Sequence, residues 1–444
     1  MTLREAALAI FQAGLEAGNV RSLLQHALRV DGSRLSVGAA EFDLGRIHRL
    51  LVLGAGKASG AMAEGVEELL GDRITQGLVV VKDGYTASTR RIRLVEAGHP
   101  LPDERGERAA LELLALAQSA GEDDLVLVLI SGGGSALTPA PIPPITLAEK
   151  RALTRELLAA GATINELNAV RKHCSFLKGG QLAKAAAPAA VVSLILSDVV
   201  GDLLDVIASG PTAPDETTYA EALAILDRFG LRDRIPPSVR HHLERGARGE
   251  IPETPKAGDP IFRPVTNHVV GNNRLVVEAA EAKARQLGFH THIVTRSLQG
   301  EARQVAHQLA ELARRTKSTR QPVQPPACLI AGGETTVTVR GRGTGGRCQE
   351  FCLAAALHIR GSQDVLVLAA GTDGTDGPTD AAGAIADGET LRRAAQQGLD
   401  ALACLDNNDS FAFFSALGDL VTTGPTNTNL LDLYLVLVGA LPSK

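Results

Sequence analysis

The sequence predicts an α/β fold with two domains: an N-terminal domain built on a parallel sheet flanked by helices, and a smaller C-terminal α/β domain with a mixed sheet. Three observations indicate this fold class. The chain has 444 residues, more than one hydrophobic core usually organises. Short apolar segments alternate with helix-length segments, which is the pattern of βαβ units. The apolar segments are continuous instead of alternating, as in a sheet covered on both faces.

The first half of the chain supplies the predicted parallel sheet. Residues 3–29 are expected to form one or two helices, and residues 164–187 are expected to be helical on both sides of Gly179–Gly180. Buried strands are predicted at five apolar segments: residues 50–53, 77–84, 92–96, 125–130 and 191–198. The other helices are predicted at residues 57–70, before residue 120, and at residues 146–160, 218–229 and 237–245.

A proline-rich, irregular segment at residues 249–264 marks the predicted domain boundary. We therefore expect an N-terminal domain over residues 1–255 and a C-terminal domain over residues 256–444. The second half is expected to contain strands at residues 268–271, 291–295, 365–370 and 432–439, with a hairpin or two strands at residues 327–339. Its helices are expected at residues 275–287, 300–315, 348–359 and 410–417.

Composition and charge exclude several classes of function. A net charge of −5 without any basic run argues against a nucleic-acid partner. The chain has no run of about 18 apolar residues, so no membrane span is expected. The five cysteines form no CxxC pair, which favours reduced thiols in a cytoplasmic protein. The sequence leaves a homodimer open.

Five loops share one design, in which an apolar strand ends and a run of Gly, Ser, Thr and Asp residues follows. They are Gly54–Gly60, Ser131–Ser135, Ser197–Thr212, Gly332–Thr336 and Gly371–Asp380. Ligands of open α/β sheets bind at the carboxyl ends of the strands. Five such loops in one chain therefore predict a phosphate-rich site.

The first of these loops, GAGKASG, leads from a buried strand into a helix. Backbone N–H groups around Gly54 and Gly56 suit an anion at the helix end, and Lys57 adds a full positive charge. The loop is not a Walker A motif, and it departs from the dinucleotide fingerprint because Ser59 replaces the third glycine. We expect Lys57 to bind a phosphate or a carboxylate; the alternative is a tight turn with a solvated lysine.

Two glycine-rich loops are further candidates for anion binding. The loop after the 125–130 strand offers a backbone cradle with two hydroxyls: Ser131, Gly132, Gly133, Gly134 and Ser135. In the second loop, Gly345 and Gly346 precede Arg347 at a predicted helix start. Arginine binds a carboxylate or phosphate through two parallel hydrogen bonds. The four glycines within residues 341–347 predict a flexible loop that closes over a ligand.

Aspartates follow two of the predicted strands. Asp198 ends the 191–198 strand, and Asp202 and Asp205 come after it. Asp373 and Asp376 lie in the loop after the 365–370 strand, together with Asp380. Carboxylates at such positions hold Mg²⁺ or accept a hydroxyl proton in phosphoryl transfer. Helix caps and turn residues are the alternative for each of them. The histidines His99, His173 and His268 are expected to be structural.

Seven motifs of the chain resemble those of the class II glycerate 2-kinases. They are GAGKASGAMAEGVEE, LISGGGSAL, LNAVRKHCSFLKGGQLA, LSDVVGDLLDVIASGPT, AGGETTVTVRGRGTGGRCQEF, LAAGTDGTDGPTDAAGA and DSFAFFSALGDLVTTGPTNTN. The resemblance covers residues 3–440 in the family's order. It implies a Rossmann-like N-terminal domain, a C-terminal MOFRL domain, and transfer of a phosphoryl group from ATP to D-glycerate with Mg²⁺, commonly at the 2-hydroxyl. It also matches Lys57 to the family's essential lysine and Arg347 to the arginine of its TGGRxQE motif.

The resulting hypothesis places ATP across the glycine loops in the cleft between the domains. Lys57 stabilises the γ-phosphoryl group, and Arg347 holds that group or the glycerate carboxylate. Asp198 or Asp202 holds Mg²⁺, helped by Asp373, and a carboxylate near the 2-hydroxyl accepts its proton, with Asp198 the catalytic candidate.

Two other functions stay open at this point. An NAD(P)H-dependent hydroxypyruvate reductase is favoured by the near match to the dinucleotide fingerprint and by an older name used within the family. A non-catalytic nucleotide-binding regulator is the third possibility, but a passive phosphate site would rarely collect so many acidic residues.

Overall fold

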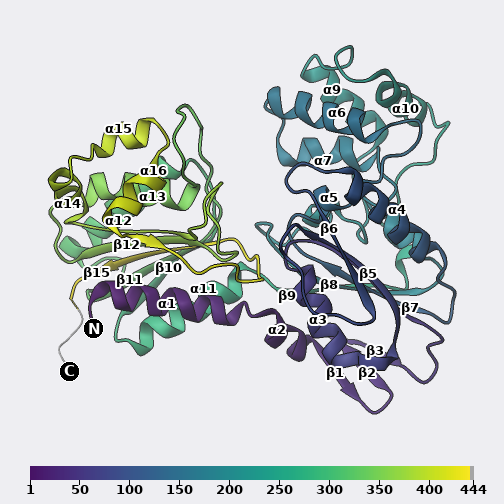
Figure 1. Cartoon of the computed structure of the whole chain (residues 1–444), viewed down its shortest axis with the longest axis horizontal. Helices are drawn as coiled ribbons and strands as arrows, with labels where there is room; N and C mark the ends of the chain where they lie inside the picture. Colours follow the sequence, from purple (N-terminus) through teal and green to yellow (C-terminus); the bar gives the residue numbers. More distant parts are fainter. Residues whose placement is uncertain (441–444) are drawn as a thin grey trace. The chain divides into compact units, whose positions relative to one another are not determined.

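A computed structural model describes residues 1–440 of the chain (Figure 1). These residues form two compact units. Residues 20–270 form one, which we call the parallel-sheet unit, and residues 1–19 pack with the residues from Gly271 onward in the other, the mixed-sheet unit. The predicted α/β fold class with a parallel and a mixed sheet is confirmed. None of the helices among these residues is long and apolar enough to cross a membrane.

The parallel-sheet unit contains a six-stranded sheet in the order β6-β5-β4-β7-β8-β9. Its strands are β4 (Leu50–Ala55), β5 (Ile74–Lys82), β6 (Ile92–Ala97), β7 (Leu125–Ile130), β8 (Ala190–Leu196) and β9 (Val265–Gly271). The central strand β4 runs parallel to both of its neighbours, and Ala55 pairs with Ile130 at its end. Every residue of β7 is buried, because helices cover both faces of the sheet. Because β4 and β7 are parallel and end opposite each other, the loops that follow them lie at the same edge of the sheet.

The second structural component of the parallel-sheet unit is its set of helices. They are α2 (Val20–Ala27), α3 (Ser59–Leu70), α4 (Glu104–Gln118), α5 (Gly134–Leu137), α6 (Leu147–Ala159), α7 (Ile164–Lys172), α8 (Gln181–Ala186), α9 (Tyr219–Arg228) and α10 (Pro237–Ala247). Threonine capping boxes begin α6, α7 and α9. Helices α6, α7, α9 and α10 enclose a core of their own, which includes Leu153, Val170 and Leu243.

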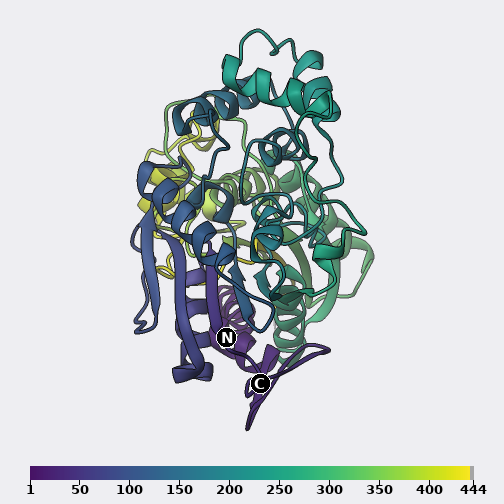
Figure 2. The ribbon, with the colours of Figure 1, turned by 90° about the vertical axis from the view of Figure 1, so that its right-hand side faces the viewer.

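A small antiparallel sheet in this unit was not predicted. It consists of β1 (Leu28–Asp31), β2 (Arg34–Val37) and β3 (Ala40–Asp43). Its strands are short and largely exposed, so they lack the apolar run that identifies a buried strand. Figures 1 and 2 show this sheet and the α9–α10 pair at opposite ends of the parallel-sheet unit.

The mixed-sheet unit contains a sheet in the order β10-β11-β15-β12-β13-β14. Its strands are β10 (His290–Leu298), β11 (Ala327–Gly333), β12 (Val365–Gly371), β13 (Gly383–Asp387), β14 (Leu420–Val421) and β15 (Asp432–Val438). Strands β10 and β11 are parallel, and the other pairs are antiparallel. Its helices are α1 (Leu3–Ala17), α11 (Asn273–Gln286), α12 (Ala302–Thr319), α13 (Arg347–Ile359), α14 (Thr390–Gln396), α15 (Ala401–Asp406) and α16 (Ser410–Leu417).

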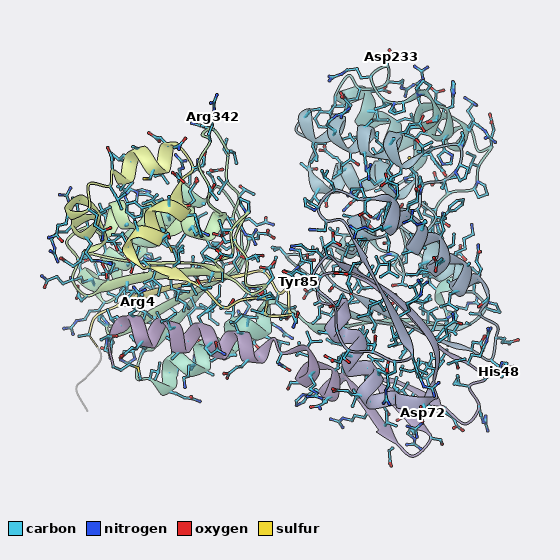
Figure 3. The ribbon with its side chains drawn as sticks, viewed as in Figure 1. Arg4, His48, Asp72, Tyr85, Asp233 and Arg342 are labelled. Carbon is cyan, nitrogen blue, oxygen red and sulfur yellow. The ribbon has the colours of Figure 1, made fainter. Side chains whose placement is uncertain are left out.

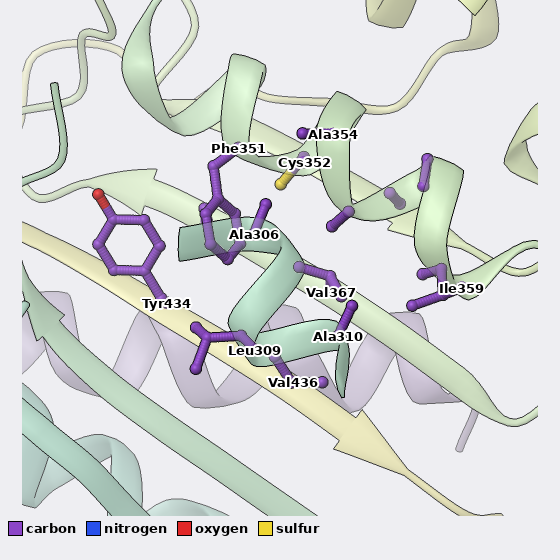
Figure 4. Close-up of a cluster of buried hydrophobic side chains, with 14 of the residues drawn as sticks. Ala306, Leu309, Ala310, Phe351, Cys352, Ala354, Ile359, Val367, Tyr434 and Val436 are labelled. Carbon is purple, nitrogen blue, oxygen red and sulfur yellow. The ribbon is translucent and has the colours of Figure 1, made fainter. Parts of the chain in front are cut away.

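The core of the mixed-sheet unit lies between its sheet and helices α12 and α13 (Figure 4). Phe351 of α13 packs edge-to-face on Tyr434 of β15, with 4.9 Å between the ring centroids. The Tyr434 hydroxyl donates a hydrogen bond to Asp432 at 3.0 Å. This contact connects the apolar core to the polar residues at the start of β15.

The units differ from the predicted division at residues 255 and 256 in two places. Helix α1 packs on α11 in the mixed-sheet unit, because its apolar face has its partner there. Strand β9, which was predicted to open the second half, is the edge strand of the parallel sheet. The expected pairing within residues 327–339 is wrong, since β11 ends at Gly333 and its neighbours are β10 and β15.

Candidate active site

The loops after β4 and β7 are joined by backbone hydrogen bonds. The N–H of Lys57 donates to the carbonyl oxygen of Gly132 at 2.8 Å. The N–H of the next residue, Ala58, donates to Oγ of Ser131 at 2.9 Å. The sequence placed these residues in separate candidate loops, and the register of the sheet brings them together.

Gly54 and Gly56 are required by the close approach of the two loops. A Cβ on Gly54 would lie 2.4 Å from the carbonyl oxygen of Leu129, and a Cβ on Gly56 would lie 2.0 Å from Oγ of Ser131. Gly56 also has a φ of +149°, which side-chain-bearing residues rarely adopt. Both glycines therefore keep the Lys57 backbone against the neighbouring loop.

The buried hydroxyl of Ser59 strengthens the same contact. It donates to the carbonyl oxygen of Leu129 at 3.2 Å and lies 3.1 Å from Oγ of Ser131. The close helix packing that the third glycine of a dinucleotide fingerprint allows falls one residue later, at Gly60. A Cβ there would lie 2.6 Å from the carbonyl oxygen of Tyr85. Ser59 can therefore replace the third glycine of the dinucleotide fingerprint, because helix α3 makes its close approach at Gly60 instead.

Gly133 lies between two side chains of the site. A Cβ on Gly133 would be 3.4 Å from Cγ of Lys57 and 3.0 Å from the imidazole ring of His99. His99 follows β6, so it also belongs to a strand-end loop. We expected it to be structural, and the position of its strand was the signal that could have identified it.

Ser135 gathers basic side chains that the sequence analysis did not single out. Its Oγ accepts hydrogen bonds from Nη2 of Arg171 at 2.8 Å and from Nζ of Lys178 at 2.9 Å. Nζ of Lys178 also donates to the carbonyl oxygen of Ser135 at 2.7 Å. The motif RKHCSFLKGG carries both cations, but only the fold places them at the Ser131–Ser135 loop.

The aspartate loop after β8 contains residues with different surroundings. Asp205 pairs with Nζ of Lys172 at 3.2 Å, and the same ammonium lies 3.3 Å from Asp215. Burial acts to raise the pKa of Asp215, but Lys172 holds it below its usual range. Asp205 therefore has a structural ion pair. Asp198 and Asp202 are partly buried, and Asp202 has a φ of +53°.

The predicted metal ligands do not form a preassembled cluster. Among residues 1–440, no three His, Cys, Asp or Glu side chains gather in a group that could hold a metal ion. Mg²⁺ commonly uses only one or two carboxylates together with substrate phosphates. Asp198 and Asp202, which share one loop, therefore still fit such an ion.

Arg347 begins α13 and is bound to carboxylates of its own unit. Its Nε and Nη2 donate to the two oxygens of buried Asp432 at 2.6 and 2.8 Å, and Nη1 lies 3.0 Å from Glu334. Burial acts to lower the pKa of Arg347, but Asp432 holds it above its usual value. Asp373 lies beside this pair, because a Cβ on Gly371 would contact both Asp373 and Asp432.

The glycines before Arg347 are packed closely against other segments. A Cβ on Gly345 would lie 2.1 Å from Oγ of Ser410, and a Cβ on Gly346 would lie 2.2 Å from Asp376. Asp376 in turn accepts hydrogen bonds from the backbone N–H groups of Cys348 and Gln349, so it caps α13. Burial raises the pKa of Asp376 to about 7, although the two N–H donors oppose this. Close packing, not only flexibility, explains these glycines. Arg342, farther along the same loop, is exposed (Figure 3).

Comparison with known proteins identifies the family. Residues 6–244 match a domain of unknown function, DUF4147, and residues 327–432 match the MOFRL family. The chain is 40% identical over 440 residues to a glycerate 2-kinase of Pyrococcus horikoshii, covering 99% of this chain and 98% of the relative. The chain belongs to the glycerate kinase family. Another member, from Agrobacterium vitis, is 44% identical over 399 residues, covers 88% of this chain and 87% of its own, and has the provisional name hydroxypyruvate reductase.

The fold agrees with that of a solved family member. The crystal structure of the glycerate kinase of Thermotoga maritima superimposes with a TM-score of 0.85 at 39% identity. The match covers 98% of this chain and 99% of that one. Within this glycerate kinase fold, the structure brings Lys57 together with the Ser131–Gly134 segment in the parallel-sheet unit. It brings Arg347 together with Asp373 and Asp376 in the mixed-sheet unit.

Proposed function

We propose that this chain transfers the γ-phosphoryl group of ATP to the 2-hydroxyl of D-glycerate, giving 2-phosphoglycerate and ADP. Nearly full-length similarity to glycerate kinases supports this function. The observation that carries it is the attachment of Lys57 to the Ser131–Gly134 loop at the carboxyl ends of β4 and β7. Ligands of open α/β sheets bind at this edge.

Positioning and charge stabilisation supply most of the catalysis in phosphoryl transfer. We assign Lys57 to the charge that develops on the γ-phosphoryl group, with Gly54, Gly56 and the Ser131–Gly134 segment around the phosphates. Asp198 is our candidate for accepting the proton of the 2-hydroxyl. The backbone bonds that fix Lys57 restrict its movement, so less reorganisation is needed when the substrate binds.

Arg347 is the proposed anion-binding residue of the mixed-sheet unit, with Gly345 and Gly346 at its helix start. Two of its nitrogens stay with Asp432, and Nη1 can exchange Glu334 for an oxygen of a reactant. Glu334 is partly exposed, so this exchange removes no buried ion pair.

The proposed Mg²⁺ ligand is Asp202 when Asp198 acts as the base; Asp198 is the alternative ligand, and Asp373 is a further candidate. Bound Mg²⁺ neutralises charge on the transferring phosphates. In this proposal the aspartates hold the metal ion. The ion pair of Asp205 with Lys172 anchors the loop that carries Asp198 and Asp202.

The second candidate function is an NAD(P)H-dependent hydroxypyruvate reductase, which the provisional name of the Agrobacterium vitis relative favours. Two assays separate the functions. The first combines D-glycerate, ATP and Mg²⁺ and measures ADP; the second combines hydroxypyruvate and NADH or NADPH and measures absorbance. We expect ADP formation and no oxidation of the reduced cofactor. Cofactor oxidation without ADP would overturn the proposal, and phosphorus NMR of the product would distinguish 2-phosphoglycerate from the 3-isomer.

We also propose a cytoplasmic location, which the five free cysteines support. Sedimentation of the purified protein at several concentrations will test whether it forms a homodimer.

A further inference from the structure

Three basic side chains of the parallel-sheet unit act on one another electrostatically, and two of them, Arg171 and Lys178, bond Ser135 of the Ser131–Ser135 loop. They come from different segments: Lys150 from α6, Arg171 from the last turn of α7, and Lys178 from the turn before α8. Lys150 is 4% exposed and Lys178 is 1% exposed. None of the three forms an ion pair with any residue in the range 1–440. Buried cations are normally paired, because removing an unpaired charge from water is costly.

Two donors of this cluster lack any hydrogen-bond partner. Nζ of Lys150 and Nε of Arg171 are buried and make no hydrogen bond within the described part of the chain. The other contacts of Arg171 and Lys178 go to Ser135, whose hydroxyl also lies 2.9 Å from that of Ser209. Several N–H donors thus converge near a partly exposed serine. Orphaned donors of this kind indicate a missing acceptor.

Lys172, next to Arg171 in the sequence, shows that the fold can pair a buried cation. It is 2% exposed and lies 3.2 Å from Asp205 and 3.3 Å from Asp215. In the cluster of Lys150, Arg171 and Lys178, by contrast, the positive charges repel one another. Burial, together with the charges of Lys150 and Arg171, lowers the pKa of Lys178 well below its usual range. An anion would relieve both the burial cost and this repulsion.

We propose that Lys150, Arg171, Lys178 and Ser135 form the subsite that binds the carboxylate of glycerate. This inference rests on the proposed function, because it names the place where that substrate's fixed negative charge binds. Ser135 follows Gly133 by two residues, and a Cβ on Gly133 would lie 3.4 Å from Cγ of Lys57. The carboxylate carbon of glycerate is bonded directly to the carbon that bears the 2-hydroxyl. Neighbouring subsites on one short loop therefore suit the carboxylate and the reacting group.

A planar guanidinium binds either a carboxylate or a phosphate, so the choice of a carboxylate rests on the neighbouring position of the 2-hydroxyl subsite. Arg171 presents a planar guanidinium with a free Nε edge, which matches a carboxylate.

The test compares D-glycerate with D-glyceramide, its neutral amide of nearly the same size. We expect Lys178→Met and, separately, Lys150→Met to lower kcat/KM for D-glycerate about 10- to 100-fold, because each removes a charge-assisted contact. The preference for glycerate over glyceramide should fall by the same factor, while KM for ATP stays unchanged. Lys184→Met, at an exposed lysine of α8, is the control and should change neither quantity.

A binding measurement keeps the test independent of turnover and of folding. Calorimetric titration of D-glycerate into each folded variant should show weaker binding than in the wild type. A higher KM for ATP with an unchanged glycerate preference would assign the cluster to phosphate and overturn the inference. An unchanged preference with unchanged binding would also overturn it. If the wild type itself neither binds D-glycerate nor forms ADP, the proposed function fails, which is a distinct outcome.

Discussion

Lysines of the parallel-sheet unit have different roles because their surroundings differ. Lys57 is fixed through its backbone N–H, which donates to Gly132 in the next loop. Lys172 is buried between two carboxylates and connects α7 to the aspartate loop. Lys150 is equally buried but has no hydrogen-bond partner in the described structure. We therefore expect these lysines to respond differently to substitution.

Replacing Lys57 by alanine should lower kcat for glycerate phosphorylation about a hundredfold. The lost contact stabilises charge in the transition state, and such contacts contribute ~3 kcal/mol. The unfolding temperature should change little, because the backbone hydrogen bond of Lys57 remains. Steady-state kinetics and thermal unfolding, with Lys184→Ala as the control, provide the measurement. Turnover close to that of the wild type would refute the assignment.

Replacing Lys150 by methionine should stabilise the ligand-free protein. Burial and the charge of Arg171 lower the pKa of Lys150 to about 7. Between this pH and the pKa of an unfolded lysine, the unfolded chain binds a proton that the folded chain does not. The wild-type free energy of unfolding therefore rises with pH over this window. Below about pH 7 the buried lysine is charged, and its full destabilising effect is present.

Denaturant unfolding of the wild type and the Lys150→Met variant from pH 6 to pH 10 measures this effect. The variant should be more stable by about 1–4 kcal/mol at the acidic end, and the difference should shrink as the pH rises. Lys172→Met should instead be destabilising, because it removes the ammonium group that stabilises the charge of buried Asp215. A Lys150→Met variant that is less stable than the wild type at pH 6 would contradict the account.

At the scale of elements, the site depends on the contact between two strand-end loops. Strands β4 and β7 end in register, so the residues after Ala55 and Ile130 meet. Small residues make this contact close enough for direct hydrogen bonds between the loops. The geometry around Lys57 is therefore a property of the pair of loops, and a single methyl group should disturb it.

Gly56→Ala should destabilise the protein by about 2–4 kcal/mol and lower activity as well. Its Cβ would lie 2.0 Å from Oγ of Ser131, in a backbone conformation that alanine disfavours. Gly32→Ala is the matched control: Gly32 also has a positive φ, of +59°, but its Cβ would meet no atom within 4 Å. The control should cost about 1 kcal/mol and leave kcat intact. Denaturant unfolding and kinetics test both, and equal effects would exclude the clash as the cause.

At the scale of the whole molecule, the chain begins in one unit, continues through the other and then returns. Helix α1 packs on α11 in the mixed-sheet unit, and Arg4, labelled in Figure 3, forms an ion pair with Asp419 of that unit at 2.6 Å. Residues 20–270 then form the parallel-sheet unit. The stability of the mixed-sheet unit therefore depends on residues at both ends of the chain.

Ile10→Ala should weaken the mixed-sheet unit selectively. Ile10 is fully buried on α1, and truncation of such a residue costs about 2–5 kcal/mol. Hydrogen exchange followed by mass spectrometry should show faster exchange in α11 and β15 and unchanged exchange in β4 and β7. Leu8→Ala, on the exposed face of the same helix, should have little effect. Faster exchange in β4 and β7 alone would refute the assignment of α1 to this unit.

Local sequence patterns were sufficient for much of the fold and for part of the site. The continuous apolar run at β7 predicted a buried strand, because only a strand covered on both faces excludes polar residues completely. The GAGKASG turn predicted an anion site at a helix start, since its glycines follow a strand directly. These features depend on residues near one another in the sequence.

By itself, the sequence determined the α/β class, the strand-end loops and the resemblance to glycerate kinases. The tertiary structure alone decided that α1 joins the mixed-sheet unit, that Arg347 pairs with Asp432, and that Arg171 and Lys178 bond Ser135. The physical reason is the range of the interactions. Strand and turn propensities are set by neighbouring residues, whereas the partner of a buried charge is set by chain segments that only folding brings together.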